Sequence, residues 1–278
     1  MGHAPRFVPI DPAIVRYYER SSEETRLEQG PFRLEQERTR ELLRRFMPLP
    51  PATVVDVGGA AGAYSLWLAD AGYHVHLVDP IPRLVAEARR RSALAARPIL
   101  SCRVGEARSL DLADRTADVV LLLGPLYHLS ARDRRLRALV EARRACRSGG
   151  FVAAAAISRF APLLDMLARR GLEDDRVRAN VADELERGAR VAPSRRTSPF
   201  PDAYFHRVEE LAEEVVEAGL TLEAIFGVEG PAALLVDLGA RMQQPVARER
   251  VLWAARALET EPSVLGTSPH LLAVARRH

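Results

Sequence analysis

The stretch VVDVGGAAGAYS at residues 54–65 contains residue types that could hold a ligand directly against the backbone. An apolar run is followed by one carboxylate and then by residues with small side chains or none: Asp56, Gly58, Gly59, Ala60 and Gly62. A turn without bulky side chains suits a dinucleotide, a phosphate, a sulfonium cofactor, or close packing without any ligand. The residue pattern has to decide among these four.

Two phosphate-binding patterns can be tested directly on this turn. A P-loop requires a lysine followed by Ser or Thr after its second glycine, and the chain contains no lysine, so this pattern is excluded. A dinucleotide fingerprint needs a central glycine, which lets a pyrophosphate approach the backbone, but this sequence has Ala60 there. The remaining pattern fits a ligand that lacks a diphosphate and is neutral or positive near the turn.

The segments around this turn alternate between strand and helix. Short apolar runs predict seven strands, at 52–58, 73–79, 99–104, 117–124, 151–158, 221–228 and 270–277. Helical patterns lie between most of them, at 62–71, 81–95, about 130–147 and 207–218. This alternation predicts an α/β, Rossmann-like fold with a seven-stranded, mostly parallel sheet and helices on both faces.

The remaining segments predict a helical cap over the sheet. Residues 1–50 form an N-terminal helical cap or lid, and 51–158 form the cofactor-binding half of the α/β domain. Residues 159–205 form a helical insertion that covers the acceptor. The α/β domain then continues over 206–278, with a second helical insertion at about 231–262.

Charge and composition narrow the classes of function. All 40 cationic side chains are arginines interleaved with acids, and the net charge is only +3, which favours a solvated surface over a nucleic-acid site. The missing lysine and single asparagine indicate a bacterial genome of high GC content. No apolar run reaches the ~18 residues of a membrane span, and the first residues do not resemble a secretory signal. Two distant cysteines, Cys102 and Cys146, suit a cytoplasmic protein with reduced thiols.

Four further segments accompany the glycine turn in a fixed order along the chain. Asp79 ends the second strand, 23 residues after Asp56. The segments VGEARSLDL, LLLGPLYHL and CRSGGFVAAA then follow at 104–112, 121–129 and 146–155. With the turn, they resemble the class I S-adenosylmethionine-dependent methyltransferases, in particular small-molecule enzymes with a GPLYHL segment and N-terminal cap helices. The resemblance extends over the whole predicted sheet.

This resemblance implies S-adenosylmethionine as the cofactor and S-adenosylhomocysteine as its product. It implies that Asp79 accepts hydrogen bonds from both ribose hydroxyls, that Glu106 meets the exocyclic amine of adenine, and that the backbone N–H of Ala107 faces a ring nitrogen. The residues implied to bind the cofactor are Asp56, Gly58, Gly59, Ala60, Gly62, Asp79, Pro80, Glu106, Ala107, Leu123, Gly124, Tyr18 and Arg26. The family usually has glycine in place of Ala60, whose Cβ is unfavourable if φ is positive. We expect the turn to bind the cofactor nevertheless.

Residues of the N-terminal helices are expected to fold over the cofactor. In families with such helices, a tyrosine hydroxyl or a guanidinium commonly meets the cofactor carboxylate, and Tyr18 and Arg26 are the candidates here. Packing at the surface is the alternative for both residues.

The segment Gly124-Pro125-Leu126-Tyr127-His128 lies where the methyl group is expected to point. The methyl donor is already activated, so a base is needed only if the acceptor must lose a proton. We therefore expect His128 to be a general base or to orient the acceptor, with Tyr127 shaping the pocket; local packing is the alternative for His128. Methyltransferases that act on nucleobase amines resemble one another in a side chain at this place that accepts a hydrogen bond from the target amine. Gly124 has no such side chain. The segment also contains no carboxylate for Mg²⁺, and no metal site is expected.

Aromatic and basic residues elsewhere are expected to form the acceptor pocket, namely Tyr17, Arg159, Phe160, Tyr204 and His206. The sequence thus predicts a metal-independent methyltransferase that modifies nitrogen or oxygen, rather than carbon, of a small molecule, as a monomer or homodimer. Two alternatives stay open: an RNA or protein methyltransferase, and a cofactor-binding protein without catalytic activity.

Overall fold

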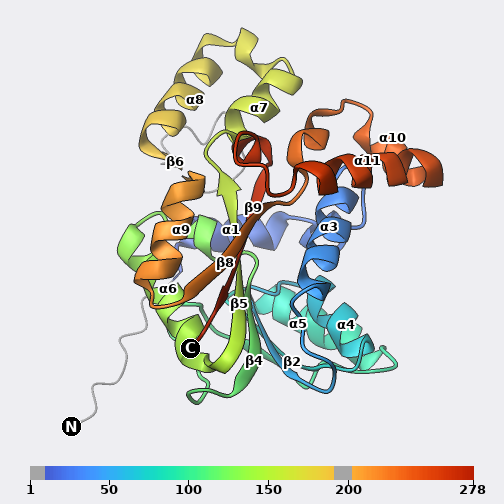
Figure 1. Cartoon of the computed structure of the whole chain (residues 1–278), viewed down its shortest axis with the longest axis vertical. Coiled ribbons are helices and arrows are strands. Elements are labelled where there is room, and N and C mark those ends of the chain that lie inside the picture. The colour runs from blue at the N-terminus through green and yellow to red at the C-terminus, as the bar shows by residue number, and fades with distance from the viewer. Residues whose placement is uncertain (1–9, 191–201) are drawn as a thin grey trace.

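The computed structural model describes residues 10–190 and 202–278 (Figure 1). Residues 1–9 of the predicted N-terminal cap and 191–201 of the predicted insertion lie outside the described residues. No helix in the described ranges is both long enough and apolar enough to cross a membrane.

A mostly parallel sheet lies at the centre of the described chain. Its seven main strands are β1 (Thr53–Val57), β2 (His74–Asp79), β3 (Ser101–Val104), β4 (Ala117–Leu122), β5 (Cys146–Ser158), β8 (Thr221–Gly227) and β9 (His270–Arg276). They follow the order β3-β2-β1-β4-β5-β9-β8, and β9 is antiparallel to both of its neighbours. The predicted α/β fold and all seven predicted strands are therefore confirmed.

The sheet also contains two short strands that the sequence did not predict. β7 (Ala203–His206) pairs in parallel with the last two residues of β5, and β6 (Ala189–Arg190) pairs antiparallel with β7. The described sheet thus has nine strands instead of seven. Strands of two and four residues are too short to show the periodicity by which the longer ones were recognised.

Helices cover both faces of the sheet (Figure 1). One face packs against α3 (Phe32–Arg44), α4 (Ala63–Asp70) and α5 (Pro82–Ala93), and the other against α6 (Arg132–Ala145) and α9 (Val208–Glu217). Fully buried side chains fill the two interfaces, such as Leu42 and Leu68 on the first face and Leu139 and Leu211 on the second. Buried apolar side chains on both faces explain why the strands read as continuous apolar runs.

The other helices are α1 (Pro12–Arg20), α2 (Glu23–Arg26), α7 (Ala161–Ala168), α8 (Asp175–Arg187), α10 (Leu238–Gln243) and α11 (Pro245–Leu258). Short 3₁₀ turns are η1 (Leu126–His128), η2 (Gly171–Glu173), η3 (Gly230–Leu234) and η4 (Leu265–Thr267). A separate apolar cluster joins α3 to α10 and α11 through Leu34, Leu238 and Leu252. The helices from the two ends of the chain thus support each other.

Strand order reverses at β1, which has β2 on one side and β4 on the other. In open α/β sheets, ligands bind beyond the carboxyl ends of the strands at such a reversal. The turn that follows β1 and the loop that follows β4 are therefore the places to look for a site.

Candidate active site

A cavity of about 170 Å³ lies at the carboxyl ends of the parallel strands. Its walls come from the turns after β1 to β4, from β5 and β9, and from the N-terminal helices α1 to α3. Of the residues predicted to bind the cofactor, all except Gly62 line this cavity, and so do Tyr127 and His128. Residues spread over the first half of the chain are thus brought together at one edge of the sheet.

The glycines after β1 allow a close approach between two loops. A Cβ on Gly58, whose φ is 76°, would lie 2.9 Å from the Pro125 ring in the loop after β4. A Cβ on Gly59 would lie 2.8 Å from the carboxylate of Asp56. Gly62, with a φ of 86°, begins helix α4, so it shapes the turn instead of lining the cavity.

Ala60 adopts the left-handed conformation that was expected to be unfavourable for it, with a φ of 47°. Its backbone N–H donates a hydrogen bond of 2.9 Å to Oδ2 of Asp79. The turn therefore keeps its shape without glycine at this position, and the bond to Asp79 helps to hold it.

Asp79 faces the cavity and is only 4% exposed. Besides the bond from Ala60, its Oδ1 accepts a hydrogen bond of 2.8 Å from the backbone N–H of Ile81. Burial raises the pKa of Asp79 to about 6, although both backbone donors favour the ionised form. Each carboxylate oxygen still has acceptor capacity, so Asp79 can receive two further hydrogen bonds from a ligand.

The other predicted cofactor carboxylates, Asp56 and Glu106, are already engaged within the protein. Asp56 is 1% exposed and accepts a 2.6 Å hydrogen bond from the hydroxyl of Ser65 in α4, and burial raises its pKa to about 6. It therefore supports the glycine turn from below. Glu106 accepts a 2.6 Å bond from Arg108. This pairing orients Glu106 in the cavity wall beside Ala107.

His128 is bonded to the N-terminal cap. Its Nε2 lies 2.7 Å from the hydroxyl of Tyr18, a contact that ties α1 to the loop after β4. Burial lowers the pKa of His128 to about 4, so the ring is neutral at pH 7 and a weak base. The environment of His128 therefore argues against the predicted role as general base and for a role in positioning the cap. Tyr127 lines the cavity beside it, and burial raises its pKa.

Arg26 lines the cavity, but its charge is already paired. Its guanidinium bonds both oxygens of Glu35, at 2.8 and 3.1 Å, and also Glu23 at 3.0 Å. A cofactor carboxylate would have to compete with these two glutamates. The predicted contact between Arg26 and the cofactor carboxylate therefore does not follow from this geometry.

The residues predicted to contact the acceptor do not line this cavity, so its geometry does not support that role for them. Arg159 is 3% exposed and donates to the carbonyl of Phe205 at 2.8 Å and to Glu210 at 2.8 Å. His206 is fully buried, with Nε2 3.3 Å from Glu214. The others outside the cavity lining are Tyr17, Phe160 and Tyr204. Arg159, Tyr204 and His206 bond the backbone of Phe205 and the side chains of Glu210 and Glu214, and so join β5, β7 and α9.

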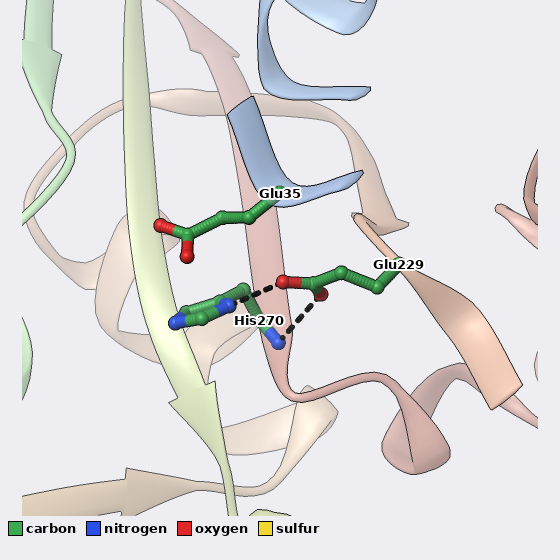
Figure 2. Close-up of side chains that lie close together, drawn as sticks. All are labelled: Glu35, Glu229 and His270. Carbon is green, nitrogen blue, oxygen red and sulfur yellow. Dashed lines mark hydrogen bonds and ion pairs between the residues drawn. The ribbon is translucent and has the colours of Figure 1, made fainter. Parts of the chain in front are cut away.

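Sequence reasoning missed a cluster of three titratable side chains at the cavity: Glu35, Glu229 and His270 (Figure 2). Glu35 and His270 line the cavity, and Glu229 lies behind His270. Glu35 lies in a helix rich in alternating charges and carries no local signal. His270 begins β9, and only the antiparallel direction of this strand brings its first residue to the cavity edge.

The lining residues fit an S-adenosylmethionine ligand. Eight carboxylate side chains line the cavity, against three arginines, and this excess suits a positively charged sulfonium and ammonium. Asp79 offers acceptors for two hydroxyls, and the small residues after β1 leave the backbone accessible. The parallel sheet with one antiparallel strand, and this ligand site at its reversal point, define a Rossmann-like methyltransferase fold.

Comparisons with known proteins agree with this class. The sequence model of a family described as a methyltransferase domain matches residues 55–154. Residues 55–154 thus match a methyltransferase domain, and together with the fold and the site this match supports S-adenosylmethionine as the cofactor. No curated protein matches the sequence.

Solved structures with a similar fold include three methyltransferases from other organisms. A Methanosarcina mazei SAM-dependent methyltransferase is 14% identical, with a TM-score of 0.58 over 85% of this chain and 96% of that one. A Thermotoga maritima enzyme described as a candidate histamine N-methyltransferase is 16% identical, with a TM-score of 0.57 over 96% and 99%. A candidate methyltransferase from Haloferax volcanii, in complex with the Trm112 activator, is 19% identical, with a TM-score of 0.60 over 95% and 96%. At these identities the likeness concerns the fold.

Proposed function

We propose that the protein transfers the methyl group of S-adenosylmethionine to nitrogen or oxygen of a small-molecule acceptor, without a metal ion. The observation that carries this proposal is the cavity between the N-terminal helices and the strand ends, which has about 170 Å³ of space. A site roofed by α1 to α3 suits a metabolite that enters whole and is shielded from water.

The residues divide the work between cofactor and acceptor. Asp79 binds the ribose hydroxyls, Glu106 and Ala107 border the adenine, and the backbone of Gly58 to Ala60 lies along the methionine part of the cofactor. When bound, S-adenosylmethionine supplies an activated methyl group, so the protein mainly aligns the acceptor and excludes water. Tyr18 and His128 hold the cap closed over both ligands, because their 2.7 Å contact joins α1 to the edge of the sheet.

A metal-independent reaction is supported by the chemistry of the cavity. The loop after β4 has no carboxylate between Gly124 and His128. Glu35 is the cavity carboxylate closest to a histidine and a second acid, but both of its oxygens already bond Arg26. A divalent ion would need these oxygens as direct ligands and would have to displace the guanidinium.

An RNA or protein substrate is the main alternative. The Haloferax volcanii relative in complex with an activator protein makes a protein partner worth testing here. The acidic lining of the cavity argues against RNA, because phosphates need a basic surface. A cofactor-binding protein without activity is the second alternative, motivated by Ala60 in the cofactor turn. The proposal includes a cytoplasmic location and a monomer or homodimer.

Calorimetry with S-adenosylhomocysteine, followed by labelled methyl transfer, tests the proposal. We expect micromolar binding, and transfer of label from radioactive S-adenosylmethionine to a low-molecular-weight component of a bacterial metabolite extract. Absence of cofactor binding at high micromolar concentration would reject the proposal. Binding without label transfer would favour the inactive protein, and label recovered in RNA or protein would favour the main alternative.

A further inference from the structure

Glu35, Glu229 and His270 meet at the cavity from three separate parts of the chain (Figure 2). Glu35 comes from α3, Glu229 directly precedes η3, and His270 is the first residue of β9. One polar atom of each lies within 4.8 Å of the others. His270 also continues a wall of the cavity, because Leu272, two residues along the same strand, pairs with Ala155 and both line it.

The structure holds His270 in one orientation. Its Nδ1 lies 2.5 Å from Oε1 of Glu229, which is 4% exposed. The second oxygen of Glu229 accepts bonds from the hydroxyl of Ser268 at 3.0 Å and from the backbone N–H of His270 at 3.1 Å. A carboxylate fixed by three donors places the Nδ1 proton of the imidazole on its own side. The proton-accepting atom is then Nε2.

The second ring nitrogen of His270, Nε2, lies on the side of the ring that Glu229 does not contact. In Figure 2 it lies on the side of the ring away from Glu229 and beneath the Glu35 carboxylate. The His270 side chain is 23% exposed, and it lines the cavity together with Glu35. A ligand atom between Nε2 and Glu35 would therefore meet a proton acceptor and a negative charge at once.

Each element packed against His270 contributes a charged or titratable group near its ring. They are Glu229 beside η3, Glu35 of α3 and Arg26 of α2, with Tyr64 of α4 next to Glu35. Burial by itself lowers the pKa of His270, but Glu229 and Glu35 raise it, and the result is a pKa of about 9. The free protein therefore carries a proton on His270 at pH 7.

We propose that Glu35, His270 and Glu229 form an amine-binding and proton-accepting site for the methyl acceptor. The acceptor is accordingly an amine, and this inference rests on the proposed methyltransferase function. Each oxygen of Glu35 keeps acceptor capacity beside its bond to Arg26, and through it Glu35 pairs with the ammonium group. His270 takes the proton through Nε2, and Glu229 positions and polarises His270. The excess of carboxylates in the cavity favours a cationic acceptor over an anionic one.

The proton step balances within these residues. The acceptor arrives as an ammonium ion. Its positive charge displaces into water the proton that Nε2 of His270 carries in the free protein. One N–H bond of the ammonium then breaks, its proton moves to Nε2, and the electron pair stays on nitrogen as the nucleophile. When bound, S-adenosylmethionine supplies the methyl group, and its sulfur keeps the electron pair of the broken C–S bond. His270 afterwards returns its proton to water.

The first test measures the histidine alone. In proton NMR of the full chain, the His270 ring signal, assigned by its loss in His270→Gln, is expected to titrate well above pH 6.5, near pH 9. Glu229→Gln should move this midpoint down by at least about one pH unit, because the partner charge is lost. His74→Gln, which alters an exposed histidine on β2, should leave the midpoint in place. A His270 midpoint at or below 6.5 in the wild type would overturn the inference.

The second test uses three probes of one shape: 2-phenylethylamine, 2-phenylethanol and phenylacetate. Calorimetry is performed on the protein saturated with S-adenosylhomocysteine, so failure of the proposed function shows separately as lack of cofactor binding. We expect the amine to bind at least about tenfold more tightly than the alcohol, and phenylacetate to bind most weakly. Glu35→Gln should remove the preference, whereas Glu37→Gln on the same helix, outside the cavity, should retain it.

Proton counting gives the sharpest outcome. At pH 7.5 the wild type should release about one proton per amine bound, seen as a dependence of the heat on the buffer, and His270→Gln should release none. Tighter binding of phenylacetate, or failure of the amine to bind the cofactor-saturated protein at millimolar concentration, would refute the amine site. Micromolar binding of Zn²⁺ or Mg²⁺ that His270→Gln abolishes would replace it by a metal site.

Discussion

Two regions of the molecule contain buried charged residues that are used in different ways. One is the edge of the sheet at the cavity, and the other is the start of the helical insertion after β5. Asp79 and Arg159 are 4% and 3% exposed, so burial does not distinguish them. The acceptor capacity of Asp79 faces a cavity, whereas the guanidinium of Arg159 is used by two backbone carbonyls and Glu210. A buried charged residue is therefore a candidate for ligand binding only if part of its hydrogen-bonding capacity remains directed at an open space.

A neighbouring network on α6, β7 and α9 shows how functional-looking residues can bind one another away from the cavity. Arg135 bonds Glu214 through two nitrogens, at 2.7 and 3.0 Å, and its guanidinium stacks 3.5 Å from the Tyr204 ring. Glu214 also contacts His206, whose pKa burial lowers. This network joins α6, α9 and β7, and none of its four residues lines the cavity.

The largest effect in this comparison is expected for Arg159→Met. The substitution removes a charged donor from Glu210 and from two backbone carbonyls, and we expect a loss of about 3 kcal/mol in the free energy of unfolding, measured in urea. Affinity for S-adenosylhomocysteine should not change. Arg169→Met, which removes an ion pair of a 71% exposed arginine on neighbouring surface, should cost less than about 0.5 kcal/mol. Weaker cofactor binding by Arg159→Met, measured where both proteins are fully folded, would restore the predicted role of Arg159 in ligand binding.

Asp79→Ala should produce the reverse pattern, with a large effect on the cofactor. The loss of two hydrogen bonds to a charged acceptor is expected to weaken S-adenosylhomocysteine binding about 100-fold in calorimetry. Stability should also fall, because the N–H groups of Ala60 and Ile81 lose their acceptor. Asp70→Ala at the exposed end of α4 is the control and should bind normally. An Asp79→Ala protein that binds as tightly as the wild type contradicts the assignment of the cofactor site.

The pH dependence of cofactor affinity sharpens the same comparison. The pKa of Asp79 is about 6 in the folded protein, and the ionised form is the better acceptor for ribose hydroxyls. Affinity should therefore be nearly constant above pH 7 and fall about fivefold as the pH decreases from 6 to 5. Asp79→Asn should bind weakly and without this dependence. An unchanged slope in Asp79→Asn would assign the dependence to another group.

A smaller effect is expected where the cap meets the sheet. Tyr18→Phe removes the hydroxyl that contacts His128, and we expect a loss of about 1 kcal/mol in stability. A double-mutant cycle with His128→Gln should give a coupling energy of similar size, because each residue is the partner of the other. Additive effects of the two substitutions would show that the contact does not hold the cap in solution.

The smallest effect is expected at the glycine turn. Ala60→Gly relieves a left-handed backbone conformation and should raise the free energy of unfolding by less than about 1 kcal/mol. Cofactor affinity should stay within about twofold, because the N–H that bonds Asp79 is retained. Ala61→Gly, at a buried neighbour that does not need a positive φ, should instead lower stability. Loss of stability in Ala60→Gly would mean that the turn gains from the alanine methyl.

The sequence was sufficient to predict the sheet and to group the glycine turn with Asp79, because both depend on local patterns. Runs such as 117–124 are apolar since β4 is buried on both faces, and Asp79 is the last residue of its strand, directly after two buried apolar residues. β7 could not be predicted in this way, since its pairing with β5 depends on a chain segment that returns from the insertion.

The acceptor side could not be predicted because it depends on long-range packing. Glu35 and His270 meet only after α3 packs on the sheet and β9 enters it antiparallel. For His128 the sequence indicated its place in the cavity wall, but its low pKa is a result of burial under the cap. The sequence tells which titratable group is present, whereas the protonation state of that group depends on the neighbours that folding brings to it.

The antiparallel direction of β9 has a consequence for how such a protein can diversify. It brings a residue near the end of the chain beside helices from its beginning, while the glycine turn and Asp79 come from the stretch between them. Selection on the two outer portions can thus alter the cavity around His270 while the middle stretch, with the glycine turn and Asp79, is inherited intact. New specificities in such a lineage would then accumulate at opposite extremes of the gene.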